Sequence, residues 1–383
     1  MTSKLYLSPD LNMRRLHTAF KNKFPECSFV SYQFYRKIVK CDFPNYSFAR
    51  PRTDTCRTCD LLAAKVKTAN NDLLRQRLKK TLELHHMKAE KAMDVHRKKI
   101  AESKMPGCKF SNMAIDLQQV MFVPTLTHSD MFYQRQLSCY NLGVNISDSG
   151  QSYMCMWSEL EAGRGGNEVI SCIFHILNDA AIIHRKNIAI WSDNCVGQHK
   201  NKMAVLMYMF LIANGIYHTI EHNFLVSGHS FLPCDRDFAL VEKRKKVTKA
   251  FIPSDLHEIV RSAKTTVPFK IVDMTDKPFF DFGEPAKKLL NAEKLKIKTV
   301  AGIKVTRNSI ETGTVFTKSK SKGAWKPVKI LKKNVSVQHL RALTLSSIEH
   351  CNRISVEKKN DLLSMIEYLP NEDHKKFYLE NLK

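Results

Sequence analysis

The segment that decides the fold is IAIWSDNCVGQHKNKMAVLMYMFLIANG, residues 188–215. It opens with a short apolar run that ends at Trp191, and its β-branched and aromatic residues predict a strand buried on both faces. A polar stretch follows, and the apolar run over 203–212 predicts a buried helix. Asp193 therefore stands at the carboxyl end of a strand, where open α/β sheets collect ligands and catalytic groups. The alternative is an aspartate that caps the next helix or faces solvent.

The sequence on both sides predicts a mixed sheet with helices on both faces. Three strand-like runs come first: FSNMAIDLQQVMF (110–122), QLSCYNLGVNIS (136–147) and YMCMWSELEA (153–162). A helix over NEVISCIFHILNDAAIIH (167–184) leads into the strand before Asp193. After the helix that follows, YHTIEHNFLV (217–226) predicts a fifth strand, and LPCDRDFALVEKRKK (232–246) predicts a helix.

We expect three regions. Residues 1–107 predict a helical module, with one long helix or a helical hairpin over 60–104 that is interrupted at 70–72. Residues 108–250 form the α/β core. Residues 268–383 predict short strands with basic loops and then a helical tail. Because the first twenty residues resemble helix from the middle of a domain, we expect the natural chain to begin further upstream.

The charge of the chain favours a polyanionic partner. Its 61 lysines and arginines face 37 aspartates and glutamates, a formal net charge of +24. Nucleic acid is the commonest such partner, although anionic membranes and acidic proteins also attract a basic surface. The basic runs KRKKVTK (243–249) and KSKSKGAWKPVKILKK (318–333) are either DNA contacts, nuclear import signals or solvated faces.

The cysteines and the apolar runs limit the compartment. Eleven cysteines are scattered along the chain, and its first residues do not have the pattern expected of a secretory leader. We therefore expect reduced thiols, with or without one metal site. The longest apolar run is shorter than the roughly 20 residues that cross a bilayer. We therefore expect no membrane span, and the basic runs over 243–249 and 318–333 lead us to expect a nuclear protein.

Three aspartates carry the candidate chemistry. Asp116 interrupts the first strand, Asp193 ends the fourth and Asp235 opens the helix after the fifth. Carboxylates that converge from different elements can hold two Mg²⁺ or Mn²⁺ ions about 4 Å apart for phosphoryl transfer. An unpaired charge inside an apolar strand is costly, so Asp116 needs a partner, either a metal ion or a lysine or arginine. Glu242 shares a helix face with Asp235, whereas Asp237 is rotated by about 200°.

Several neighbouring polar residues have two interpretations. Amides close to the aspartates either hold phosphate or sugar oxygens or are polar turn residues: Gln118, Gln119, Asn194 and Gln198. His222 and His229 flank the end of the fifth strand, and packing is favoured over a role in assisting the leaving group.

The sequence DTCRTCD (54–60) predicts half of a structural zinc site. Cys56 and Cys59 have the C-x-x-C spacing of tetrahedral zinc ligands. The missing ligands are expected to be one histidine of the long helix (His85, His86 or His96) together with Cys41 or another residue. His85 and His96 would lie about 16 Å apart on one helix, so they cannot share an ion.

The order Asp116, Asp193, Asp235, with WSDNCVGQHKN and GHSFLPCDRDFALVE at the last two, resembles RNase H-like transposases of the DDE/DDD superfamily. More narrowly, it resembles a group of transposase-derived animal proteins with a WSDNC-x-GQ-x-KN segment. The resemblance extends over residues 51–246 and implies an RNase H-like core. It favours Asp235 over Asp237, leaves Glu242 as an accessory acid and places a zinc ligand at His85. Members of the group usually have asparagine where this chain has His199.

Two functions remain as hypotheses. The first is metal-dependent cleavage or strand transfer of DNA phosphodiesters by Asp116, Asp193 and Asp235, with the zinc module and the basic C-terminal region gripping DNA. The alternative is a domesticated, catalytically silent DNA-binding or chromatin-associated protein. A nuclease that acts on RNA would use the same metal ions. The chain could also form a homo-oligomer, which the sequence leaves open.

Overall fold

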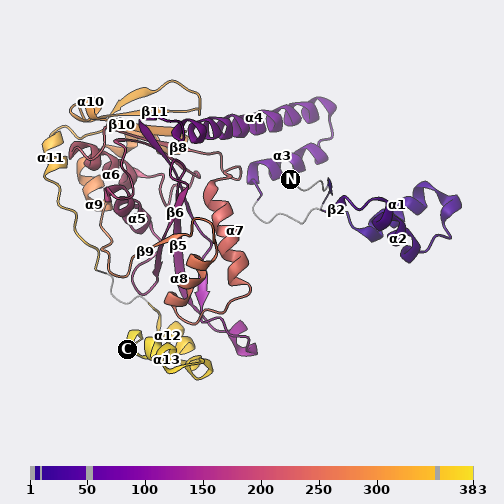
Figure 1. Cartoon of the computed structure of the whole chain (residues 1–383). Coiled ribbons are helices and arrows are strands. Elements are labelled where there is room, and N and C mark those ends of the chain that lie inside the picture. Colours follow the sequence, from indigo (N-terminus) through magenta and orange to yellow (C-terminus); the bar gives the residue numbers. More distant parts are fainter. Residues whose placement is uncertain (1–4, 9–10, 49–54, 350–353, 383) are drawn as a thin grey trace. The chain divides into compact units, whose positions relative to one another are not determined.

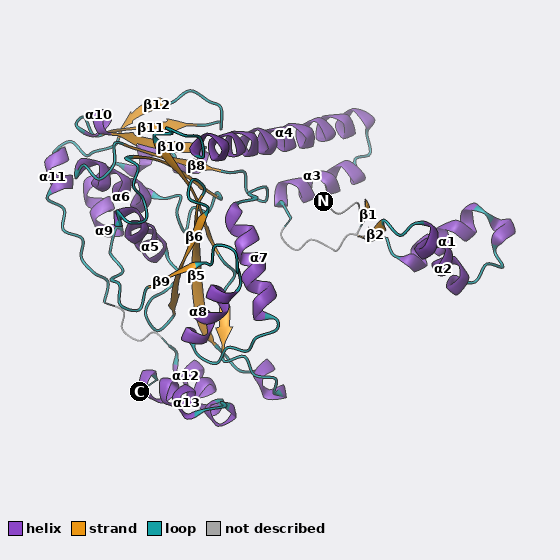
Figure 2. Ribbon diagram, viewed as in Figure 1, coloured by secondary structure: helices purple, strands orange, loops and turns teal. Residues whose placement is uncertain are grey.

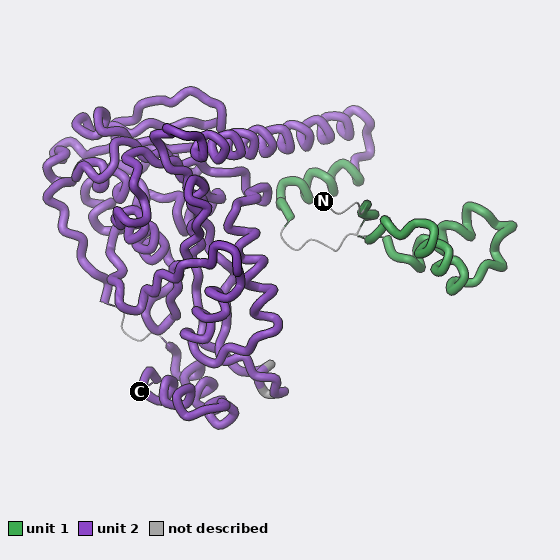
Figure 3. The backbone as a smooth tube through the Cα atoms, in the orientation of Figure 1, with its two compact units in different colours: residues 1–68 green, residues 69–383 purple. Residues whose placement is uncertain are grey.

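The computed structural model describes residues 5–8, 11–48, 55–349 and 354–382. The chain divides into two compact units, Met1–Thr68 and Ala69–Lys383 (Figure 3). This division falls before the long basic helix, so that helix belongs to the larger unit and not to the N-terminal module that the sequence predicts over 1–107.

The first unit is a small helical module. Its helices are amphipathic and end in basic residues, and the described strands form one short parallel pair. Its elements are β1 (Leu5–Leu7), α1 (Met13–Lys23), η1 (Pro25–Cys27), α2 (Tyr32–Asp42), β2 (Tyr46–Phe48) and α3 (Arg57–Thr68). The stretch with strong helix formers is thus broken where the sequence predicts a break, because Asn71 caps the next helix through the Leu73 N–H at 2.8 Å.

The second unit is built on one mixed sheet (Figure 2). Its strand order is β12-β11-β10-β8-β7-β3-β5-β6-β9, and β4 pairs with β5. The β3–β7, β7–β8 and β6–β9 pairs are parallel and the others are antiparallel. The strands are β3 (Phe110–Leu117), β4 (Met121–Val123), β5 (Leu137–Ile146), β6 (Gln151–Ser158), β7 (Asn187–Ser192), β8 (Thr219–Phe224), β9 (Lys270–Asp273), β10 (Gly302–Thr306), β11 (Thr314–Lys318) and β12 (Lys326–Lys329).

Helices cover both faces of this sheet (Figure 1). One face packs on α5 (Gly166–Asn178), α6 (Lys202–Ala213) and α9 (Gly283–Leu289), and the other on α4 (Asp72–Ser103), α7 (Pro233–Lys245) and α8 (Pro253–Ser262). The remaining helices are α10 (Arg307–Ile310), α11 (Val337–Arg341), α12 (Val356–Ser364) and α13 (Glu372–Asn381), with short 3₁₀ turns η2 (Ser129–Phe132), η3 (Ala292–Leu295), η4 (Ile297–Thr299) and η5 (Ile366–Tyr368).

The sequence pattern explains which face each residue serves. Side chains alternate along β3, so Met113, Ile115 and Leu117 join the core under α5 and α6, while Ala114 joins the core under α4 and α7. Because side chains two residues apart in a strand share a face, Asp116 lies on the same face of the sheet as Ala114, which is the face covered by α4 and α7. The helix α6 is apolar all round because it is buried on nearly every side.

The predicted α/β class, with a large mixed sheet between helices, is confirmed. The strands and helices expected over 108–250 are present, and the strands expected in the basic C-terminal region occur as β9, β11 and β12. Residues 268–383 do not stand apart, however, because β9 pairs with β6 and β10 pairs with β8 in the same sheet. Among the described residues, no helix combines the length and the apolarity needed to span a membrane.

Candidate functional site

Asp116 is the most strongly perturbed acid of the predicted set. Its Oδ1 accepts a hydrogen bond from the Leu117 N–H at 2.9 Å. Burial, and then the charges of Asp235 and Asp193, raise the pKa of Asp116 to about 7. Within the described part of the chain, Asp116 forms no ion pair with lysine, arginine or histidine, so the salt bridge that the sequence left open is not present. This half-buried carboxyl has two other carboxyls, and more weakly His199, as its electrostatic neighbours.

Close packing of α7 on the sheet brings Asp235 to Asp116. The Cys234 thiol donates to the carbonyl oxygens of Ala114 and Gly143, each at 3.4 Å. Gly143 is the strand partner of Asp116, and a Cβ atom at this glycine would lie 2.7 Å from the Phe238 ring. The first two turns of α7 therefore rest directly on β3 and β5.

Asp235 itself is oriented by the start of its helix. The Leu232 N–H donates to Asp235 Oδ2 at 2.7 Å, and the Asp235 N–H donates back to the Leu232 carbonyl at 3.2 Å. This reciprocal capping fixes the carboxylate at the N-terminal end of α7. The helix cap that the sequence offered as an alternative for Asp193 is thus found at Asp235.

Asp193 follows β7 and is held by two donors. Its Oδ1 accepts from the Cys195 N–H at 3.0 Å and lies 2.6 Å from His199 Nε2. Burial raises the pKa of Asp193, but the hydrogen bond and the charge of His199 outweigh burial, and the net pKa lies below the ordinary value. His199 is fully buried, and its role in holding Asp193 is not predictable from the sequence.

The rest of the loop between β7 and α6 is tied together internally. Lys200 is buried, and its ammonium donates to Asn194 Oδ1 at 2.5 Å and to the Val300 carbonyl at 2.7 Å. Burial lowers the pKa of Lys200 to about 8. Asn201 caps α6 by accepting the Ala204 N–H at 3.0 Å. Asn194 thus serves the loop, in agreement with the turn-residue interpretation.

Glu242 lies further along α7 and away from Asp235. Its Oε1 accepts from Gln118 Nε2 at 2.9 Å and from Lys245 Nζ at 2.9 Å. Gln118 Oε1 in turn accepts from Asn141 Nδ2 at 2.8 Å. Gln118 and Glu242 therefore belong to a hydrogen-bond network that connects α7 to the end of β3 and to β5.

Asp237 and His222 have structural partners as well. Asp237 is buried and accepts a hydrogen bond from the Ser152 hydroxyl at 2.6 Å. His222 is fully buried between the Ser192 hydroxyl and the Tyr208 hydroxyl, each at 2.9 Å. Burial holds the pKa of His222 well below its ordinary value, and this supports the packing interpretation.

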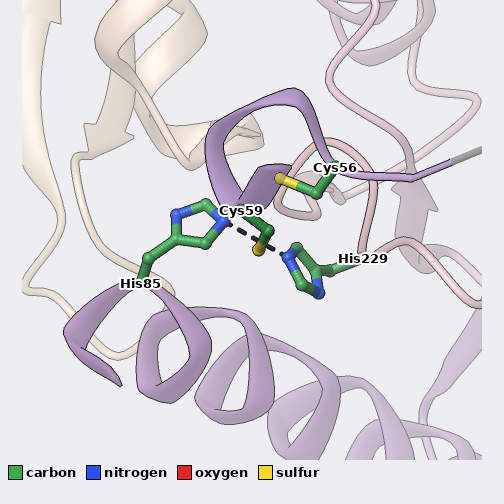
Figure 4. Close-up of side chains that lie close together, drawn as sticks. All are labelled: Cys56, Cys59, His85 and His229. Carbon is green, nitrogen blue, oxygen red and sulfur yellow. Dashed lines mark hydrogen bonds between the residues drawn. The ribbon is translucent and has the colours of Figure 1, made fainter. Parts of the chain in front are cut away.

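A second cluster joins two cysteines and two histidines (Figure 4). The thiols of Cys56 and Cys59 and one ring nitrogen each of His85 and His229 all lie within 4.8 Å of one another. The two Nε2 atoms of the histidines are 3.2 Å apart. Burial, and then the Cys56 thiol, raise the pKa of Cys59 to about 11, so the Cys59 thiol needs a nearby cation before it ionises at neutral pH. This cluster could bind a structural metal such as zinc.

His229 occupies the position in this cluster for which the sequence predicts Cys41. Cys41 is exposed on α2 and is not a member of the group. His96, a weaker candidate, packs its ring on Trp191 with centroids 4.7 Å apart. Among the described residues, the Cys56, Cys59, His85 and His229 cluster is the one group of three or more histidine, cysteine or acidic side chains whose ligand atoms all lie within 4.8 Å of one another. The carboxylate oxygens of the three aspartates are therefore not all this close together.

Comparison with known proteins gives one result. Residues 130–322 match the family described as Domain of unknown function (DUF7869). The match includes Asp193, Asp235 and the strands β10 and β11, whereas Asp116 lies before its first residue. No curated protein and no protein of solved structure matches the chain. Since the match extends over half of the sequence, the chain belongs to the DUF7869 family.

Proposed function

We propose that the chain is a transposase-derived protein with an RNase H-like core that cleaves or joins DNA phosphodiesters with Mg²⁺ or Mn²⁺. The order of the central elements supports this proposal. The antiparallel strands β3, β4, β5 and β6 are followed by the helix α5, the parallel strand β7, the helix α6, the parallel strand β8 and then α7. This order agrees with the strands and helices that the sequence pattern predicts, and the RNase H-like assignment itself rests on the resemblance of the acidic motifs.

The observation that carries the proposal is the environment of Asp116. A carboxyl group in a buried strand, next to two other carboxyls and without an ion-pair partner among the described residues, is destabilised in its charged form. Divalent cations would relieve this repulsion, and three carboxylates from β3, β7 and α7 are suitable hard oxygen ligands for Mg²⁺ or Mn²⁺. Perturbed carboxyls of this kind cluster at functional sites.

Each acid would have one task. When bound, the metal ions supply Lewis-acid activation of a water or hydroxyl and of the scissile phosphate. Asp116, whose charge interacts with both other acids, would hold both ions, and Asp193 and Asp235 would hold one each. The Leu117, Cys195 and Leu232 N–H groups fix one oxygen of each carboxylate, so the side chains are oriented before the substrate arrives.

Nicking of supercoiled plasmid by the purified full chain tests the proposal. We expect Mn²⁺-dependent nicking that EDTA abolishes and that Asp193→Asn lowers at least about 100-fold, since one metal ligand is lost. Asp276→Asn, at an exposed position after β9, is purified in the same way as a control for contaminating nucleases. Equal nicking by the Asp193 variant and the unchanged protein would remove the nuclease assignment.

One contact favours the alternative of a catalytically silent DNA-binding protein. The His199 imidazole lies 2.6 Å from Asp193 Oδ1 and competes with a metal ion for that carboxylate. A silent protein would bind DNA with a steep salt dependence and leave plasmid intact with Mn²⁺. The net charge of +24 supports DNA as the partner in both cases, and the basic runs support a nuclear location.

We also propose that the Cys₂His₂ cluster binds zinc. Metal analysis of the purified chain is expected to find about one zinc per chain, because two thiolates and two imidazoles make a closed tetrahedral site. Cys59→Ser should lose the zinc and lower the unfolding temperature, whereas Cys41→Ser, on the exposed face of α2, should keep both unchanged. Loss of zinc from the Cys41 variant would instead support the ligand set expected from the sequence.

A further inference from the structure

A pocket of about 340 Å³ lies where the end of α4, the β5–β6 hairpin and the start of α7 meet. We propose that this pocket binds a phosphate group. That the phosphate belongs to DNA rests on the proposed function above. That the pocket binds a phosphate group does not depend on that function. The lining includes Lys104, Asn145, Ser147, Arg236, Asp237 and Lys264.

The charges of the lining favour an anion. Lys104, Arg236 and Lys264 contribute three positive charges against one carboxylate, that of Asp237. Asp237 is already neutralised in part, because Ser152 donates to its Oδ2 at 2.6 Å and Lys264 Nζ lies 3.8 Å from its Oδ1. Among the described residues, Lys104 and Arg236 form no ion pair. Both side chains are exposed, so solvent screens their mutual repulsion, and an anion bound between them would pair with both charges.

Neutral donors add to the charged ones. Ser147 is buried, with 5% of its surface exposed, and its Oγ accepts from Asn112 Nδ2 at 3.0 Å. In the described part of the chain the Ser147 hydroxyl hydrogen has no acceptor of its own. A phosphate oxygen in the pocket would accept it. Pro233 and Arg236 belong to the first turn of α7, whose positive dipole end also favours an anion here.

The pocket lies on the same side of the sheet as the three aspartates. Asn145 is two residues along β5 from Gly143, the strand partner of Asp116, so both residues point to the α7 face. Diagonal positions of this kind are about 7–8 Å apart across a strand pair. Arg236 directly follows Asp235 in α7. A nucleic-acid strand with one phosphate at the aspartates can therefore place a nearby phosphate in the pocket.

Binding without cleavage tests the pocket on its own. Fluorescence anisotropy with a DNA duplex, in Ca²⁺ and at several salt concentrations, compares the full chain with Arg236→Gln and Lys104→Gln. We expect each variant to lower the affinity about 10-fold and to reduce the slope of log K against log salt by about 1. Arg261→Gln is the matched control, since Arg261 is exposed on α8, pairs with Glu258 and lies outside the pocket. Inorganic phosphate should raise the unfolding temperature of the unchanged chain more than that of Arg236→Gln.

The same assay distinguishes between the possible sources of the phosphate, namely an internal phosphodiester, a strand end and a free phosphate or nucleotide. Equal losses with 5′-hydroxyl and 5′-phosphate duplexes indicate an internal phosphodiester, and a loss confined to the 5′-phosphate duplex indicates a strand end. Stabilisation by inorganic phosphate alone, with unchanged DNA affinity, indicates a free phosphate or nucleotide. The proposal fails if both variants keep the affinity and the salt slope, and phosphate leaves the unfolding temperature unchanged. A chain that binds in this way yet never nicks plasmid would overturn the nuclease function and leave the pocket intact.

Discussion

Asp116→Asn is expected to lower Mn²⁺-dependent nicking by about 1000-fold or more while making the chain more stable at neutral pH. The loss of activity corresponds to about 4 kcal/mol of transition-state stabilisation. It should exceed the effect at Asp193, because the charge of Asp116 interacts with both other acids and this side chain would hold both ions. The asparagine oxygen can still accept the Leu117 N–H, so the local backbone is preserved.

The gain in stability follows from the pKa of Asp116. This pKa rises from an ordinary 3.8 to about 7 in the folded chain, so the folded state binds the proton more tightly than the unfolded state. Ionisation therefore costs stability that is intact below about pH 4 and is lost as the pH rises to about 7. Asparagine resembles the protonated carboxyl, and the variant should be more stable by on the order of 2–4 kcal/mol above that pH.

Urea unfolding in EDTA at a series of pH values measures this difference. The variant and the unchanged chain should have equal stability at about pH 4 and should diverge toward neutral pH. Asp276→Asn, at an exposed site, should follow the unchanged chain throughout. A difference between Asp116→Asn and the unchanged chain that stays constant with pH would mean that the carboxyl is not strained by burial and by its neighbours.

Gly143→Ala is expected to destabilise the larger unit by about 2–3 kcal/mol, the usual cost of overpacking a core. A Cβ atom at Gly143 would lie 2.7 Å from the Phe238 ring, closer than two carbon atoms can approach. The helix α7 would have to move away from β3 and β5, and Asp235 would move with it. Nicking should therefore fall together with stability, although residue 143 has no side chain that could touch a metal ion or DNA.

A double variant separates this packing effect from others. Phe238→Leu removes the ring carbons that the new Cβ would meet, so Gly143→Ala with Phe238→Leu should cost less than the sum of the two single changes. Thermal unfolding and nicking are measured for all four proteins. Additive losses would indicate that the contact between Gly143 and Phe238 does not set the position of α7.

The sequence predicted most elements of the larger unit because their patterns are local. The apolar run before Asp193, the turn residues around the first three strands and the cap at Asn71 each act within a few residues. The strand β10 was not predicted, because its sequence GIKVT is short and acquires its role only through pairing with β8, some eighty residues earlier. Pairing over such distances leaves no periodic signal in a single sequence.

The candidate site was predictable to a similar extent. Asp116, Asp193 and Asp235 could be selected because each stands at a strand or helix position that local patterns reveal. The role of His199 could not, since its contact with Asp193 depends on how the loop folds back on itself. His229 is 144 residues from His85, and only the tertiary fold brings their rings together. Cys41 was predicted as a zinc ligand because it is close in sequence to Cys56. It is not part of the cluster, so a short distance in sequence did not predict a short distance in space.

The hydrogen bonds of the buried Lys200 ammonium also limit how many residues can be removed from the C-terminal end of the protein. Its second acceptor is the carbonyl of Val300, which leads into β10, and β10 covers the edge of β8. A fragment that stops after α8 would keep all three aspartates, but it would leave this charge without one of its two acceptors and leave β8 as a bare sheet edge that invites aggregation. A fragment expressed to carry the candidate site should therefore extend through β12, well past Asp235, the last of the three aspartates.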